Sequence, residues 1–206
     1  MPSNPLIEYT SAEEITVCCD SIEADLYLLS SGSDSILSPF EDLLDETPTS
    51  VSFDSAQTSS QQIEKWVLSP AWSGVINESV WSLEMNYEVT NAGGANVNLS
   101  AIVTVGGSTF TGYLSEASSF VTLGEGTLTI DIPMETVTVS GTSEVSLTLT
   151  ARTIVFSVPQ PEANIKFLWG SEGKDSKVSA ELPLLGLSLD EPIVEGDLVY
   201  FGLRID

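Results

Sequence analysis

The chain contains no histidine among its 206 residues. This absence excludes a Ser-His-Asp triad, a Cys-His pair and an imidazole-ligated metal centre, because each needs the histidine ring as base or ligand. The two cysteines, Cys18 and Cys19, are adjacent. Neighbours on a strand face opposite sides, so a disulfide between them would be strained. We therefore expect two free thiols, no metal site, no cofactor and no catalytic residues.

Basic residues are also scarce, since Lys and Arg total 6 against 30 Asp and Glu, for a formal net charge of −24. Binding to nucleic acid needs a basic footprint, and an anionic membrane surface would repel this chain. We expect neither partner. The acids are dispersed along the whole chain. Either their mutual repulsion keeps the protein soluble, or they are a halophilic adaptation to salt that screens the repulsion.

Long apolar runs are missing as well. No stretch approaches the roughly 18 residues of a membrane span. The segment Met1–Pro5 has neither the basic nor the apolar region of a signal peptide. The expectation is a protein that leaves a cell, if it does, by a route such as lysis.

The pattern that dominates the chain is alternation of apolar and polar residues. In 80–89 the apolar positions are every second residue: Trp81, Leu83, Met85, Tyr87 and Val89. The same alternation returns in 97–105, after a Gly-rich segment at 90–94. Strict period-two alternation is typical of a strand with one buried face. The two segments predict a hairpin with one apolar face.

Similar segments and turn signals continue to the end of the chain, at a spacing of about 8–12 residues. They predict an all-β, antiparallel β-sandwich that is jelly-roll-like, with an immunoglobulin-like sandwich as the alternative. The Ser-rich segment 56–62 suggests a boundary. We expect an N-terminal arm and small β/helix segment at 1–58 and the sandwich domain at 59–206.

Two local features interrupt the strand pattern. Ser38-Pro39-Phe40-Glu41 has the residue types of a helix start, and Thr47-Pro48 ends it, which predicts one short helix over 38–46. In the long run 144–158 the apolar residues change parity near Arg152. That change predicts a β-bulge, or a strand that passes from one sheet to another.

The four tryptophans are the residues most suited to ligand contact. Trp81 and Trp169 occupy the same alternate positions as the apolar residues of their segments, which predicts burial. Trp72 lies in a turn and is the candidate for an exposed contact. Aromatic faces suit sugar rings. Among 30 acids, pairs at glycosidase spacing arise by chance, and the loop 170–175 matches a calcium loop only weakly.

The segments Trp66-Val67-Leu68-Ser69-Pro70-Ala71 and 75–83 resemble a pattern in β-sandwich virion proteins of tailed phages and archaeal viruses. In those proteins a strand ending in a Pro turn precedes a Gly-Thr-Trp strand, and here Ser79-Val80 stands in place of Gly-Thr. The resemblance implies a minor capsid, decoration or head-fibre subunit, located in the virion, without catalysis, in a symmetric assembly.

The first hypothesis is therefore a viral structural protein whose partners are copies of itself and other virion proteins. We predict that residues 1–12 form an extended arm, because Pro2 and Pro5 disfavour a helix. Its apolar residues Leu6, Ile7 and Tyr9 would contact a neighbouring subunit. The alternative is a carbohydrate-binding or adhesive module that contacts a host surface glycan through Trp72. A hydrolase is the least favoured hypothesis, because the base is missing.

Overall fold

The fold is described from a computed structural model of the chain. The structure describes residues 22–41, 45, 47–54, 59–69, 74–91, 95–114, 118–119, 123–140, 143–156, 164–182, 187–189, 193–195, 198–200 and 203–205. The predicted arm, with Leu6, Ile7 and Tyr9, lies outside these ranges, as do Cys18, Cys19 and Trp72.

The main body is a 12-stranded sheet, and the all-β prediction is confirmed. Its members are β1 (Ile22–Ser31), β2 (Asp34–Ser38), β3 (Thr49–Asp54), β4 (Gln61–Leu68), β6 (Ser79–Asn91), β7 (Ala95–Val105), β8 (Ser108–Tyr113), β9 (Ser118–Ser119), β10 (Gly124–Met134), β12 (Val145–Phe156), β13 (Asn164–Trp169) and β14 (Lys177–Leu182). The strands pair in the order β3-β13-β6-β14-β1-β2-β4-β12-β7-β8, while β10 pairs with β6 and β9 with β7. The pairing of β2 with β4 is parallel.

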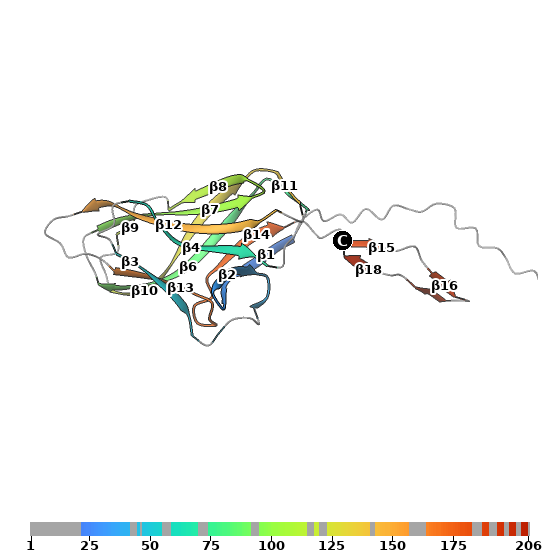
Figure 1. The fold of residues 1–206 in the computed structure, drawn as a ribbon, viewed down its shortest axis with the longest axis horizontal. Helices are drawn as coiled ribbons and strands as arrows, with labels where there is room; N and C mark the ends of the chain where they lie inside the picture. The colour runs from blue at the N-terminus through green and yellow to red at the C-terminus, as the bar shows by residue number, and fades with distance from the viewer. Residues whose placement is uncertain are drawn as a thin grey trace, which may run out of the picture.

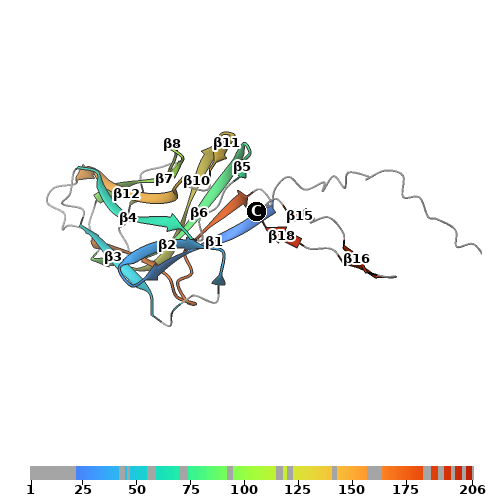
Figure 2. The same cartoon turned by 45° about the vertical axis from the view of Figure 1, so that its right-hand side comes forward.

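This sheet folds over on itself into two layers (Figure 1). Strands β10, β6, β14, β1, β13 and β3 form the first layer, and β4, β12, β7, β8 and the short β9 form the second. Figure 2 shows β4, β12 and β7 opposite β6, β14 and β1. Strand β2 joins the layers, because it pairs with β1 on one side and β4 on the other. The architecture is an all-β sandwich in which the named strand pairs are antiparallel except β2 with β4, and a jelly-roll strand order stays a prediction.

The predicted hairpin between β6 and β7 is wrong, although both strands and both buried faces were predicted correctly. Strand β6 pairs with β10, β13 and β14, and β7 pairs with β8, β9 and β12. The two strands lie in opposite layers and contribute to one core. Alternation specifies which face of a strand is buried, and two strands that face each other across a core show the same pattern as two paired strands.

The core between the layers is built around three fully buried tryptophans, Trp66, Trp81 and Trp169. Trp66 on β4 and Trp169 on β13 meet edge to face, with ring centroids 5.1 Å apart and planes at 87°. Such geometry places the positive ring edge against the negative face, which stabilises a buried aromatic pair. The Trp169 Nε1–H donates to Ser30 Oγ at 3.1 Å. The predicted burial of Trp81 and Trp169 is confirmed.

One buried serine organises the point where β6 changes its neighbour from β14 to β13. Ser176 Oγ donates to the Leu168 carbonyl at 2.7 Å and accepts from the Asn86 amide at 2.8 Å. Its own carbonyl accepts from the Leu28 amide at 2.9 Å. Each of these backbone groups would otherwise be left without a ladder partner where the strands diverge.

Two local predictions have opposite outcomes. The bulge is confirmed, because the register of β12 against β7 shifts between Thr153 and Val155. The helix over 38–46 is wrong at its ends, because Ser38 belongs to β2 and Asp45 forms a bridge with Ser171. Ser38 Oγ still accepts from the Phe40 amide at 3.2 Å, as a cap would. Pairing with β1 outweighs the local signal here, since it secures more backbone hydrogen bonds.

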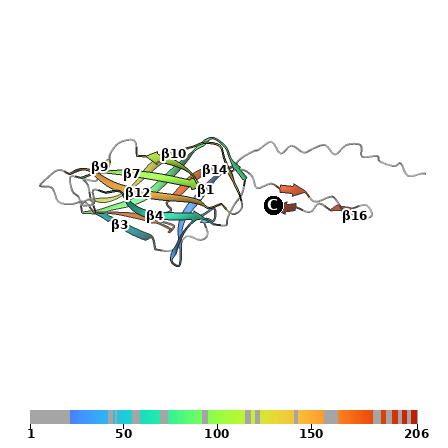
Figure 3. The ribbon, with the colours of Figure 1, turned by 45° about the horizontal axis from the view of Figure 1, so that its top comes forward.

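The boundary predicted at residue 58 falls inside the large sheet. Strands β1, β2 and β3, all before that residue, pair within it. Three further sheets are two-stranded: β5 (Gly74–Ile76) with β11 (Val137–Val139), β15 (Leu187–Leu189) with β18 (Leu203–Ile205), and β16 (Ile193–Glu195) with β17 (Leu198–Tyr200). Figure 3 shows the last two apart from the main sheet. No described helix is long and apolar enough to cross a membrane.

Candidate functional site

The outer face of the first layer carries a row of opposed polar side chains across four strands. Asp131 on β10 lies opposite Ser82 on β6, which lies opposite Ser179 on β14, which lies opposite Asp25 on β1. Ser82 Oγ donates to Asp131 Oδ1 at 2.9 Å, and Ser179 Oγ donates to Asp25 Oδ1 at 2.7 Å. Side chains opposite one another across a sheet are close enough to form such ladders.

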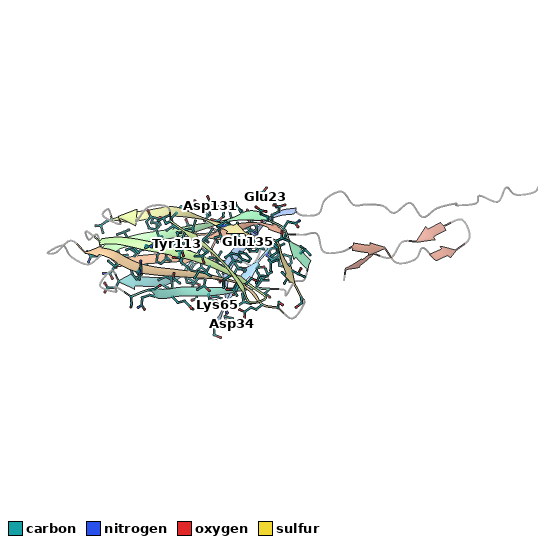
Figure 4. The ribbon with its side chains drawn as sticks, turned by 90° about the horizontal axis from the view of Figure 1, so that it is seen from above. Glu23, Asp34, Lys65, Tyr113, Asp131 and Glu135 are labelled. Atoms are coloured by element: carbon teal, nitrogen blue, oxygen red, sulfur yellow. The ribbon has the colours of Figure 1, made fainter. Side chains whose placement is uncertain are left out.

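This face is hollowed next to the row, and we call the hollow the acidic groove. It has two adjoining parts of about 430 and 450 Å³ that share Glu23 and Ser179. The remaining lining residues are Val80, Ser82, Ala180, Glu181, Ala24, Asp25, Glu84 and Lys177. Figure 4 shows Glu23 and Asp131 on one side of the body, and Asp34 and Lys65 on the other. The groove therefore presents carboxylates around a single cation.

That cation is tied to Asp25. Lys177 Nζ donates to Asp25 Oδ2 at 2.7 Å. The hydrogen bond from Lys177, with the one from Ser179, holds the pKa of Asp25 below its ordinary value. The same bond raises the pKa of Lys177. Burial, followed by the charge of Glu41, raises the pKa of the neighbouring Tyr27.

These contacts decide what the groove can do chemically. A lysine that activates a serine must lose its proton near neutral pH, so its pKa must be lowered. Here the pKa of Lys177 is raised, and the Ser179 hydroxyl proton points at the Asp25 carboxylate. The arrangement holds the charges of Asp25 and Lys177 in fixed positions and does not activate Ser179 for nucleophilic attack.

We expect Lys177→Met to lower the free energy of unfolding at pH 7 by less than about 1 kcal/mol, because the pair is partly exposed. Since the folded pKa of Asp25 is lowered, its contribution is present above the unfolded value of 3.8 and is lost as the pH falls through the folded pKa. Lys177 has a raised pKa, so its contribution is present below 10.5 and is lost above the folded pKa.

The measurement is urea unfolding of wild type and Lys177→Met from pH 2 to 8, with Lys166→Met as the control. Lys166 also pairs with a carboxylate across strands, Glu88, but at 3.4 Å. The stability gap between wild type and Lys177→Met should close at the acid end. A gap that is constant down to pH 2 would contradict the coupling to Asp25.

A second hollow, of about 260 Å³, lies on the outer face of the second layer. We call it the Tyr113 hollow, and it is lined by Ser60, Asn98, Ser100, Tyr113, Thr150, Ala151 and Arg152. Ser100 on β7 lies between Tyr113 on β8 and Thr150 on β12, and Asn98 lies opposite Arg152. Tyr113 is 61% exposed. An exposed aromatic ring among hydroxyl, amide and guanidinium groups suits a polar ring-shaped ligand.

The sequence hypotheses about sites missed both hollows. Their residues come from strands that are far apart in the chain, and no short motif joins them. One signal was available: Tyr113 is an aromatic residue in a segment otherwise rich in Ser, Thr and Gly. Trp72, the predicted exposed contact, lies outside the described residues, and Trp66, Trp81 and Trp169 are core.

The loop 170–175, which was considered for calcium, forms an ion pair with β10 through its lysine. Lys174 Nζ lies 2.6 Å from Glu125 Oε2. Ser171 is buried, and its backbone forms isolated β-bridges with Asp45 and Lys174. Within the described ranges, no three Asp, Glu or Cys residues gather in a way that could hold a metal ion.

No protein-family profile matches the chain, and no curated protein sequence does. Solved structures do match. A CocE/NonD family hydrolase from Staphylococcus aureus superposes with a TM-score of 0.53 at 11% identity, over 80% of this chain and 37% of the hydrolase. An aminopeptidase from the marine sediment archaeon Thaumarchaeota archaeon gives 0.50 at 10% identity, over 80% and 37%.

The sheet itself defines the class of the protein as an all-β sandwich, and the likenesses to solved structures concern the fold alone. The chain spans just over a third of the length of the hydrolase chains that it matches. Identity near 11% does not carry function, since one fold serves many unrelated activities.

Proposed function

We propose that the protein is a non-catalytic structural subunit of a virion, a minor capsid, decoration or head-fibre component that acts through protein–protein assembly. Three features support it: the all-β sandwich, the absence of histidine, and the resemblance of 66–83 to virion sandwich proteins. The partners in this proposal are copies of the chain and other virion proteins.

The observation that carries the non-catalytic part is the hydrogen bonding of Asp25, Lys177 and Ser179. Both the hydroxyl and the ammonium group donate to the same carboxylate, at 2.7 Å each. Neither group is left as a base for the other. A hydrolase that uses a serine needs an adjacent base, whereas here the hydroxyl and the ammonium group both donate to Asp25.

The assembly part rests on the predicted arm. We expect the full-length protein to form a closed cyclic oligomer or shell, because an extended apolar segment can add to a sheet edge or a groove of a neighbouring subunit. A variant that lacks residues 1–12 should lose assembly while its melting temperature changes little. Multi-angle light scattering over a concentration series measures the first effect, and thermal unfolding the second.

The matched control keeps the arm at full length and replaces Leu6, Ile7 and Tyr9 with serine. If apolar contacts of the arm join the subunits, this variant should behave like the truncation. A full-length protein that stays monomeric at high concentration, with an arm open to proteases, would contradict self-assembly.

A second candidate function is carbohydrate binding, and the Tyr113 hollow favours it. The exposed ring of Tyr113 lies in line with Ser100 and Thr150, so a sugar ring stacked on it would meet hydroxyl groups. A host surface glycan is the partner in this proposal. Loss of glycan binding in Tyr113→Ala, with unchanged oligomeric state, would separate this function from assembly.

A further inference from the structure

The cations whose side chains the structure describes are used in a consistent way, with one exception. Each lysine pairs with a carboxylate on another strand or loop: Lys65 with Glu144, Lys166 with Glu88, Lys174 with Glu125 and Lys177 with Asp25. Among the side chains that the structure describes, Arg152 is the cation for which no ion pair is found, and it is exposed. Carboxylates are abundant in a chain of net charge −24, so the lack of an ion pair at Arg152 is not due to a shortage of acidic residues.

The surroundings of Arg152 are neutral and polar. Its cross-strand neighbour is Asn98, and the next row of the sheet holds Thr150, Ser100 and Tyr113. None of the residues that line the Tyr113 hollow is acidic. The hollow is therefore a neutral polar surface with one available guanidinium, on a protein whose surface otherwise repels anions.

The spacing suits a single ring. Tyr113 on β8 and Arg152 on β12 are separated by one strand, β7, so their backbones lie about 10 Å apart across the sheet. Along the strands they are displaced by two residues, because Tyr113 lies opposite Ser100 and Arg152 opposite Asn98. Both side chains are long enough to reach a ligand between them. A volume of about 260 Å³ is below the roughly 300–1,000 Å³ of pockets for drug-sized ligands. One sugar ring fits this size better than an extended chain.

We propose that the Tyr113 hollow binds a sugar that carries a carboxylate, as uronic and sialic acids do. Arg152 forms a bidentate pair with the carboxylate, which the planar guanidinium matches in geometry. Tyr113 stacks on the sugar ring, and the side chains of Asn98 and Ser100 form hydrogen bonds with the hydroxyl groups of the sugar. This inference deepens the carbohydrate-binding candidate and rests on it. For a ligand of this size we expect a Kd of about 1 mM.

The experiment is saturation-transfer NMR and titration of the full chain with two matched pairs of probes. They are 3′-sialyllactose against lactose, and trigalacturonate against neutral galactotriose. We expect the acidic member of at least one pair to bind about tenfold tighter, and Arg152→Gln to remove that preference. Tyr113→Ala should abolish binding of acidic and neutral probes alike. The preference should also weaken as KCl is raised.

The control is Lys65→Gln, which removes one positive charge from the same layer but leaves Arg152 in place. It should leave the preference unchanged. Neutral and acidic probes that bind equally, in a Tyr113-dependent way, would overturn the acidic ligand class and keep carbohydrate binding. No transfer to any probe would overturn both. Neither result bears on assembly, which light scattering measures separately.

Discussion

Trp81→Ala is expected to lower the free energy of unfolding by about 3–5 kcal/mol. Trp81 is 1% exposed, and it lies opposite Ile132 of β10 on the inward face of β6. Truncation removes the transfer energy of the indole and leaves a cavity that two packed layers cannot close. Since domains are stable by about 5–15 kcal/mol, this is a large share of the total. Equilibrium unfolding in urea measures it as a fall in the midpoint at constant slope.

The control is Val80→Ala, one residue earlier on the same strand. Val80 is 61% exposed, so its truncation should change stability by no more than about 0.5 kcal/mol. Trp81→Phe should cost less than alanine, about 1–2 kcal/mol, because it also removes the indole N–H, which has no partner among the described residues. A loss of unfolding free energy below about 1 kcal/mol for Trp81→Ala would mean that Trp81 lies on the exposed face of β6, which would contradict this fold.

Gly112→Ala is expected to destabilise the protein by about 2–3 kcal/mol, although it adds one carbon. Gly112 is buried on β8, where β8 lies against β10 without pairing with it. A Cβ at this position would overlap the Asp131 carbonyl oxygen and lie 2.9 Å from both the Asp131 carbonyl carbon and Ile132 Cγ1. Backbone atoms cannot rotate away as the end of a side chain can. The two strands must separate, which opens the edge of the core.

Gly173→Ala is the matched control, because a Cβ there meets no atom within 4 Å. The same loss of chain entropy in the unfolded state applies to both glycines, and by itself it would stabilise slightly. Gly126→Ala is a useful intermediate, since its Cβ meets the end of the Tyr87 side chain rather than backbone. Thermal unfolding of the three variants should rank Gly112→Ala lowest. Equal melting temperatures for Gly112→Ala and Gly173→Ala would show that β8 and β10 are not in close contact.

Most of the strands of the main sheet, and the faces that they bury, could be predicted from the sequence. Period-two alternation is a local property, because each side chain on a strand points either to the core or to solvent whatever the neighbouring strand is. For that reason Trp81 and Trp169 were correctly predicted as core, and the change of parity near Arg152 correctly predicted a bulge in β12. The absence of histidine also came from the sequence, and it restricts the chemistry whatever the fold.

Which strands are neighbours could not be predicted from the sequence and is seen in the fold alone. β6 and β7 are consecutive and alternate alike, yet they lie in opposite layers, because sheet pairing depends on contacts between distant segments rather than on either strand alone. The same contacts drew Ser38 into β2 in place of a helix. They also placed Asn98 rather than a carboxylate opposite Arg152, and Tyr113 one row away. Cross-strand neighbours decide which charges are neutralised within the protein and which stay available to a ligand, and no local pattern records those neighbours.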